Sequence, residues 1–404
     1  MGRKHLSACQ LCRTFLLLII EIPGMNIAEL YQNSDLITRI LLGLFFLSTL
    51  AQIGYYLFIY TAISIHKSGR ISSRKHPVSV IICARNEADN LSRFLPVILD
   101  QDYPEFEVIV VNDASTDNTE MVLSEFAEKH ENLRYTNIPV NEKFTHGKKL
   151  AVTLGIKAAR HECLLFTDAD CYPAGRDWIR LMAGRFTSEK SIVLGYGRYE
   201  RRKGLLNRLI RYETLFTAIQ YFSMAIRGKP YMGVGRNLAY KKELFFTNKG
   251  FASHYHIQSG DDDLFINEVA DKNNTAVEFS KESHTISIPE KSFRDWIRQK
   301  KRHLKAGGRY SLKTKLRIAA ELISRVLFYG TLVALCIISD WIWIALCVYG
   351  LIMLTKVIVI KLGMIRLDEK FLLLPSLILD PIMPFLLAGV RISGFFVSNN
   401  RKWK

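Results

Sequence analysis

The stretch FTDADCYP, residues 166–173, decides how the chain around it can fold. It closes an apolar run that starts at Cys163, and it places two carboxylates, Asp168 and Asp170, one residue apart. The run predicts a buried strand, on which side chains two residues apart point the same way. Two like charges so placed repel each other unless solvent or a cation lies between them. Because Mg²⁺ is usually held by one or two carboxylates plus substrate phosphates, the stretch is a candidate metal site, although Asp-x-Asp is also common in solvated turns.

Two more predicted strands precede this one, and helical patterns separate the strands. Residues 78–82 and 106–111 are mostly apolar runs of strand length, whereas residues 87–99 and 149–159 have helical spacing. Strands that alternate with helices at short intervals are typical of parallel βαβ units. We therefore expect an α/β fold with a mostly parallel sheet, whose ligand would bind beyond the carboxyl ends of the strands.

A polar segment follows each of the three predicted strands, at residues 84–87, 112–117 and 167–170. A single acidic strand end is usually a helix cap or a turn, and this is the alternative for Asp117. Three polar ends that converge on one edge of a sheet indicate a binding site instead.

The chain of 404 residues is both apolar and basic. Hydrophobic residues make up 49% of it, and 55 Lys and Arg against 38 Asp and Glu give a net charge of +17. Such a balance suggests an anionic partner, which could be nucleic acid, a membrane surface or a phosphorylated substrate. The basic residues gather beside apolar segments rather than on an aromatic face, which disfavours nucleic acid.

Several apolar segments are long enough to span a membrane. Residues 40–65 predict one helix, and the basic residues after it place that end in the cytoplasm. Residues 322–339 and 341–360 predict a hairpin that leaves and re-enters the cytoplasm. Residues 371–397 contain prolines and charges, so they predict one kinked crossing or an interfacial segment, and their topology stays open.

The predicted organisation has a globular block between candidate membrane segments. Near the N-terminus, residues 15–20 resemble a signal peptide without a small-residue cleavage site, and a start at Met25 is the alternative. We expect a tail over residues 1–35, a transmembrane helix over 36–65, a globular α/β domain over 77–292, basic amphipathic interfacial helices over 293–320, and two to three spans over 322–397.

Six motifs occur in order between about Pro77 and Tyr310: VSVIICARNE (78–87), VVNDASTD (110–117), GKKLA (147–151), TDAD (167–170), GDDDL (260–264) and QKKR (299–302). Together they resemble a family 2 glycosyltransferase with the GT-A fold, in the membrane-embedded branch related to polysaccharide synthases and ceramide glucosyltransferases. Each motif is weak alone, whereas six in the family's order are specific.

The resemblance implies a nucleotide-sugar donor, either a UDP- or a GDP-sugar, whose diphosphate gains negative charge as it leaves. It implies that Asp170 is the direct ligand of Mg²⁺ or Mn²⁺, with Asp168 beside it. Lys148 would add a positive charge near the phosphates, and Lys149 is the alternative if the register is shifted by one. Donor-binding roles follow for Arg85, Glu87, Asp113, Lys148, Asp168, Gln299 and Arg302.

Residues 293–302 have helical spacing, and Gln299 and Arg302 lie three apart, hence on one face. The resemblance places them at the diphosphate. For Lys300, Lys301 and Lys305 the alternative is contact with anionic lipid head groups. The family's Gln-x-x-Arg-Trp motif has His303 here instead of the acceptor-side tryptophan, which weakens the case for a long polymer product.

The resemblance assigns Asp262 as the general base. Three adjacent acids disfavour one another's ionised forms, which would raise one pKa into the useful range. The alternative is a helix N-terminus that favours acids, and it would account for Asp261 or Asp263. In-line attack with one base predicts inversion at the anomeric carbon. The acceptor side would comprise Gly235, Arg236, Asn237, Asp261 and His303.

The sequence thus predicts a multi-pass protein of the cell (inner) membrane with a cytoplasmic catalytic domain that moves a sugar to a lipid or lipid-linked glycan acceptor. The close alternative is a processive polysaccharide synthase that extrudes its polymer. An alternative from another class is a transporter or sensor that binds nucleotide-sugar without turnover. It would use ionisable residues within the spans, for which the candidates are Glu321, Arg325, Asp340 and Asp380.

Overall fold

The computed structural model describes residues 27–396, apart from residues 68, 70, 73, 140–146, 256, 258–259 and 339. The signal-like segment, the alternative start at Met25 and the last eight residues of the chain, 397–404, lie outside the described residues. The chain divides into two compact units. One comprises Ala320–Lys356 and the residues up to Tyr55, and the other comprises Tyr56–Ala319 and the residues from Val357 onward.

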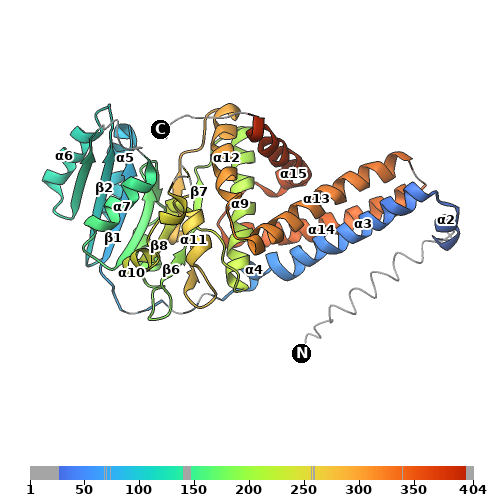
Figure 1. The fold of residues 1–404 in the computed structure, drawn as a ribbon, viewed down its shortest axis with the longest axis horizontal. Helices are drawn as coiled ribbons and strands as arrows, with labels where there is room; N and C mark the ends of the chain where they lie inside the picture. Colours follow the sequence, from blue (N-terminus) through green and yellow to red (C-terminus); the bar gives the residue numbers. More distant parts are fainter. Residues whose placement is uncertain are drawn as a thin grey trace. The chain divides into compact units, whose positions relative to one another are not determined.

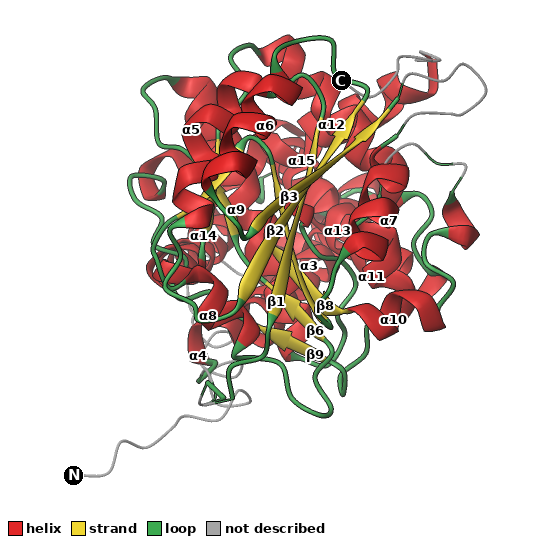
Figure 2. Ribbon diagram, turned by 90° about the vertical axis from the view of Figure 1, so that its left-hand side faces the viewer, coloured by secondary structure: helices red, strands yellow, loops and turns green. Residues whose placement is uncertain are grey.

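A seven-stranded sheet forms the centre of the second unit, which we call the catalytic unit (Figures 1 and 2). Its first four strands in space are parallel, and the expected mostly parallel α/β fold is confirmed. The strand β8 is antiparallel to both of its neighbours. In spatial order the strands are β3 (Leu133–Ile138), β2 (Phe106–Asp113), β1 (Val78–Ala84), β4 (Cys163–Asp168), β8 (Leu238–Lys241), β6 (Ile192–Leu194) and β9 (Thr275–Val277).

Alternate side chains of β1 explain why helices cover both faces of this sheet (Figure 2). Val80 and Ile82 belong to the core that also holds Leu95 of α5 (Ala88–Leu99). Ile81 points to the other face, where Gly155 of α7 (Lys148–Ala158) packs so closely that an added Cβ would lie 2.6 Å from the Ile81 Cγ2. Strands that are buried on both faces have nearly continuous apolar sequences, which is why these strands could be predicted from the sequence.

After β4 the chain turns and enters a second, three-stranded sheet. Its strands are β5 (Cys171–Pro173), β10 (Thr285–Ser287) and β7 (Gly197–Tyr199). Ala169 and Asp170 form the turn between β4 and β5. The expectation that strand alternation aligns Asp168 with Asp170 is therefore wrong, because only Asp168 belongs to the strand and Asp170 lies in the turn.

The remaining helices of the catalytic unit flank the sheets and carry parts of the site. They are α4 (Ala62–Ile65), α6 (Thr119–Lys129), α8 (Trp178–Ala183), α9 (Leu205–Ile226), α10 (Lys242–Thr247), α11 (Asp263–Val269), α12 (Phe293–Gly307) and α15 (Leu373–Phe396). The unit is therefore wider than the predicted domain over 77–292, since it also contains α4, α12 and α15.

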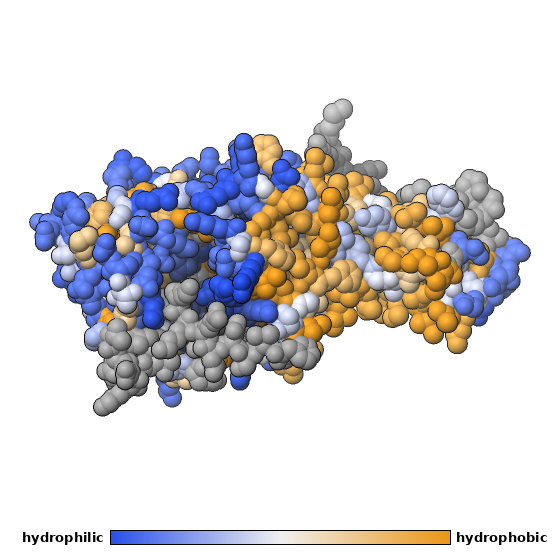
Figure 3. Space-filling model, turned by 90° about the horizontal axis from the view of Figure 1, so that it is seen from above, coloured by the Kyte–Doolittle hydropathy of each residue, from blue (hydrophilic) through white to orange (hydrophobic). Residues whose placement is uncertain are grey.

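Among the described residues, four helical segments are long and apolar enough to cross a membrane, over residues 36–65, 312–338, 342–366 and 373–393. Apolar side chains cover much of the surface of these segments in Figure 3. The first comprises α3 (Leu36–Gly54), a π-helix (Tyr55–Tyr60) and α4, and a short helix α2 (Ile27–Asn33) precedes it. The others are α13 (Leu312–Ile338), α14 (Ile342–Arg366) and most of α15.

Two boundaries in the C-terminal region differ from the prediction. Helix α13 begins at Leu312, ten residues before the predicted span, because the basic turn Lys313–Arg317 continues into the apolar run as one helix. Helix α15 runs through Pro381 and Pro384 without a break. The helix therefore tolerates both prolines, as membrane helices often do.

The smaller unit is a bundle of α3 with parts of α13 and α14. Phe45 and Phe328 stack in its apolar core with ring centroids 5.4 Å apart. Several of its buried polar groups contact one another: Gln52 Nε2 donates to Ser324 Oγ at 2.9 Å, and Glu321 forms an ion pair with Arg325. Buried polar groups in a membrane segment need such partners.

Candidate active site

The polar ends of β2, β1 and β4 meet, as expected, because these strands are neighbours in the sheet. Asp113 ends β2 and is fully buried, and its Oδ2 lies 3.9 Å from a guanidinium nitrogen of Arg85, which follows β1. Two non-glycine residues at these ends have positive φ, Asn86 (55°) and Ala114 (52°). Such backbone conformations persist only where the surroundings enforce them, and they often mark functional sites.

Hydrogen bonds tie the loop after β1 to the loop after β2. The Asn86 amide donates to Ser115 Oγ at 2.9 Å, and Asn86 Oδ1 accepts from the Thr116 amide at 2.8 Å. Asp117 accepts from the amides of Thr119 (3.1 Å) and Ala88 (3.2 Å). The capping alternative for Asp117 is therefore the observed one.

The turn after β4 gathers three potential metal ligands. One ligand atom each of Asp168, Asp170 and Cys171 lie within 4.8 Å of one another. Burial and the neighbouring Asp168 raise the pKa of Asp170 to about 6, and burial also raises the pKa of nearby Glu87 to about 7. Crowded carboxylates of this kind fit a hard divalent cation, which would relieve their repulsion.

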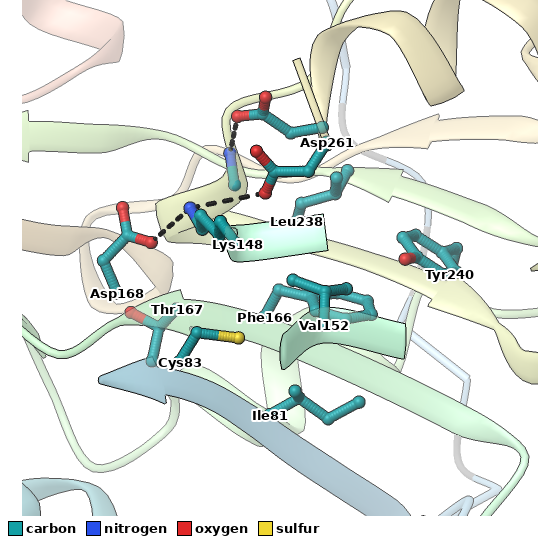
Figure 4. A pocket seen from close by; sticks show the side chains of 12 residues that line it. Ile81, Cys83, Lys148, Val152, Phe166, Thr167, Asp168, Leu238, Tyr240 and Asp261 are labelled. Carbon is teal, nitrogen blue, oxygen red and sulfur yellow. Dashed lines mark hydrogen bonds and ion pairs between the residues drawn. The ribbon is translucent and has the colours of Figure 1, made fainter. Parts of the chain in front are cut away.

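Lys148 lies at the centre of the pocket drawn in Figure 4. Its Nζ is 2.7 Å from Asp168 Oδ1 and 3.4 Å from Asp261 Oδ2. Lys149 points elsewhere: its buried Nζ donates to the backbone carbonyls of His254 (2.6 Å) and Ile257 (2.9 Å). The choice between the two lysines thus falls on Lys148 for the site, whereas Lys149 anchors the chain that leads to the triple aspartate.

Asp262 is held by two backbone amides. Gly235 N donates to its Oδ2 at 2.5 Å, and Asp263 N donates to its Oδ1 at 2.8 Å. An added Cβ on Gly235 would lie 3.0 Å from Asp262 Oδ2, so glycine permits this approach. Asp262 caps α11, so the helix-terminus explanation considered for its neighbours applies to it as well. Burial and Asp261 raise the pKa of Asp262 to about 6.

Arg236 and Asn237, two residues expected on the acceptor side, follow Gly235 in the chain but have different surroundings. The Arg236 guanidinium lies over the Tyr199 ring, 4.3 Å from its centroid, and Tyr199 OH donates to Gln299 Oε1 at 3.3 Å. Asn237 differs from the expectation. Its buried amide accepts from Trp178 Nε1 (3.0 Å) and donates to the carbonyls of Tyr196 (2.9 Å) and Ser283 (2.8 Å), so it supports the fold instead.

Helix α12 brings Gln299 beside Tyr199, while Arg302 and His303 are exposed on the same helix. Lys300 is buried and forms an ion pair with Glu213 of α9, so the head-group alternative is wrong for this lysine.

The sequence reasoning missed Tyr199, because a three-residue strand carries no periodic signal. It also passed over Cys171, although this residue directly follows the Asp-x-Asp motif.

Comparisons with known proteins agree with this fold. Residues 79–247 match the family model "Glycosyl transferase family 2". The solved structure of mannosyltransferase PcManGT from Pyrobaculum calidifontis, in complex with GDP-Man and Mn²⁺, is similar with a TM-score of 0.57 and 20% identity, and the match covers 82% of this chain and 99% of that one. At this identity the likeness shows the shared GT-A fold.

Among curated relatives, the poly-beta-1,6-N-acetyl-D-glucosamine synthase of Staphylococcus epidermidis is 34% identical over 93 residues, which are 23% of this chain and 21% of the synthase. A glucuronosyltransferase of Methanococcus voltae, whose name gives a dolichyl N-acetyl-glucosaminyl phosphate acceptor, is 28% identical over 176 residues, 42% of this chain and 50% of that enzyme. The chain therefore matches half or less of the length of each of these relatives.

Proposed function

We propose that this chain, which carries a family 2 glycosyltransferase domain over residues 79–247, transfers a sugar from a nucleotide-diphosphate donor to an acceptor at the membrane. The observation that carries the proposal is the placement of Lys148 between Asp168 and Asp261. This lysine joins the end of the parallel sheet, where a donor diphosphate would bind, to the aspartates that would serve the acceptor.

At the donor end, the proposal assigns the nucleoside to the crevice at Arg85 and Asp113, beyond the carboxyl ends of the strands. Asp170 and Asp168 would hold Mg²⁺ or Mn²⁺, which would supply positive charge to the leaving diphosphate. The ammonium of Lys148 adds to this positive charge. Arg302 and Gln299 of α12 would contact the diphosphate from the other side.

At the acceptor end, Asp262 takes the proton of the attacking hydroxyl. The acceptor oxygen bonds to the anomeric carbon while the bond from that carbon to the diphosphate oxygen breaks. The two amides on Asp262 fix the direction of its carboxylate, which favours a single base in a defined position. One displacement at one carbon inverts its configuration.

The membrane is the proposed location of the acceptor. Candidate spans precede and follow the catalytic sheet in sequence, so the site would stay close to the lipid surface. The name of the M. voltae relative includes dolichyl N-acetyl-alpha-D-glucosaminyl phosphate, a lipid-linked sugar, which supports a lipid-linked acceptor here. We place the protein in the inner membrane with its catalytic unit in the cytoplasm, where nucleotide-sugars are made.

A processive polysaccharide synthase remains the second candidate, because the S. epidermidis relative is named as a polymer synthase. A transporter is less well supported. Of its four candidate residues, Glu321 pairs with Arg325, and Asp380 accepts from Tyr56 OH and Tyr212 OH at 3.1 Å each. These contacts engage three of the four candidate residues and leave Asp340, which is exposed.

The proposal is tested with the full chain purified in detergent, Mn²⁺ or Mg²⁺, a panel of UDP- and GDP-sugars, and either farnesyl phosphate or membrane lipid extract as acceptor. We expect one donor to yield free nucleoside diphosphate together with a glycosylated lipid. A ladder of long products would favour the polymer synthase. Donor binding without any turnover would favour the sensor or transporter.

The rate of transfer should depend on pH through Asp262. Because its pKa is raised to about 6, the carboxylate is the base above that pH and is protonated below it. We expect kcat to fall as the pH is lowered through about 6, toward a tenfold decrease for each further pH unit. A kcat profile that stays flat from pH 7 to pH 5 would contradict this assignment.

A further inference from the structure

A second cavity, of about 250 Å³, lies in the catalytic unit and shares no lining residue with the pocket around Lys148, although Tyr199, which contacts Gln299 in the candidate site, also lines it. It opens between the small sheet and residues 367–372, the connection between α14 and α15. Both helices are candidate spans, and two spans in sequence would place their connection at a membrane surface. The cavity would then lie at the level of lipid head groups.

Contacts hold the connection against the catalytic unit. Tyr196 OH donates to Glu369 Oε1 at 3.2 Å, and buried Arg211 forms an ion pair with the same carboxylate. Arg198 lies 3.2 Å from Asp368 Oδ2. These two ion pairs neutralise Arg211 and Arg198, which line the cavity.

Two further cations at the cavity remain available. Within the described part of the chain, Arg201 and Lys370 have no carboxylate within ion-pair distance, and both are exposed. Glu200, the third acid in the wall, is already paired with Arg202. An anion entering the cavity would thus meet two uncompensated positive charges.

An apolar surface adjoins these cations. Phe371 is 73% exposed, with the Arg201 guanidinium over its ring at 4.7 Å, and Leu374 is 76% exposed. Asp368 and Phe371 both have positive φ, at 49° and 63°. Positive φ is energetically unfavourable for residues with a Cβ, so the surrounding structure must stabilise it at both positions.

We propose that this cavity binds the phosphate group of a membrane lipid, with Arg201 and Lys370 on the phosphate and with Phe371 and Leu374 along the hydrocarbon chain. A cavity with cations at its edge and exposed apolar side chains beside them matches an anionic head joined to an apolar tail. The phosphate could belong to a polyprenyl phosphate or to an anionic phospholipid. Binding here does not require sugar transfer, and only a role of the bound lipid as acceptor would rest on the proposed function.

The test uses the full chain in neutral detergent and titration calorimetry with three probes: farnesyl phosphate, dioctanoyl phosphatidylglycerol and zwitterionic dioctanoyl phosphatidylcholine. The double variant Arg201→Gln/Lys370→Gln removes the two cations. The matched control, Lys129→Gln/Lys157→Gln, removes two exposed cations from α6 and α7. Mn²⁺ titration of the same samples monitors the donor site independently.

We expect the anionic probes to bind the parent chain and the control equally, and the cavity variant at least about tenfold more weakly, since each charged hydrogen bond is worth a factor of this order. Loss for farnesyl phosphate alone would assign the site to a polyprenyl phosphate, loss for phosphatidylglycerol alone to an anionic phospholipid, and loss for both to the phosphate group that the two lipids share. Equal binding to the cavity variant, equal losses in the control, or the same loss for phosphatidylcholine would overturn the proposal. A chain that lacks transfer activity but shows these losses would refute the proposed function and leave the lipid site intact.

Discussion

Replacement of Asp262 by asparagine is expected to lower kcat by about 10³-fold, the range that general-base catalysis supplies, with donor affinity nearly unchanged. The variant should fold, because an asparagine oxygen can still accept from the Gly235 amide that now bonds to Asp262 Oδ2. Rates of sugar transfer under single-turnover conditions, together with calorimetric binding of the donor, separate the two effects.

Two neighbouring variants sharpen this test. Asp261→Asn should weaken donor binding more than it affects the chemical step, because Asp261 contacts Lys148. Asp263→Asn, two residues from Asp261 and in the first turn of α11, is the matched control and should retain most activity. Equal kcat in the parent chain and in Asp262→Asn would exclude Asp262 as the base, and a collapse confined to Asp263→Asn would move the role to that residue.

Replacement of Asp170 by asparagine should abolish metal-dependent donor binding and lower kcat/KM by about 10³-fold or more, because the charge on the leaving diphosphate is no longer neutralised. Removal of divalent cation by a chelator should have the same effect on the parent chain. Mn²⁺ binding followed by electron paramagnetic resonance reports on the site without any need for turnover.

The control for this variant is Asp117→Asn, which changes an aspartate whose carboxylate caps a helix at a neighbouring strand end. It should keep full Mn²⁺ affinity. The metal assignment would be refuted if Asp170→Asn bound Mn²⁺ as tightly as the parent chain, or if the chelator left the rate of transfer unchanged.

The parallel sheet and the convergence of its polar ends could be predicted because their causes are local. Residues 78–84 and 106–113 are mostly apolar and almost wholly buried, as is typical of strands covered on both faces, and the polar residues of the site stand at or directly after their carboxyl ends. The geometry of Asp170 could not be predicted this way. The chain changes sheets after Asp168, and sequence periodicity does not show where a strand ends and a turn begins.

The sequence by itself determined the fold class, the order of the motifs, the candidate membrane segments and the residue types at the site, because each follows from periodicity, length or side-chain chemistry. The tertiary structure decided which of two adjacent lysines lies in the candidate site, since Lys148 and Lys149 point in different directions from one helix. It also assigned Asn237 to the scaffold and Lys300 to an ion pair with Glu213. Those roles depend on partners that lie 59 and 87 residues away in the chain, and only folding brings such partners into contact.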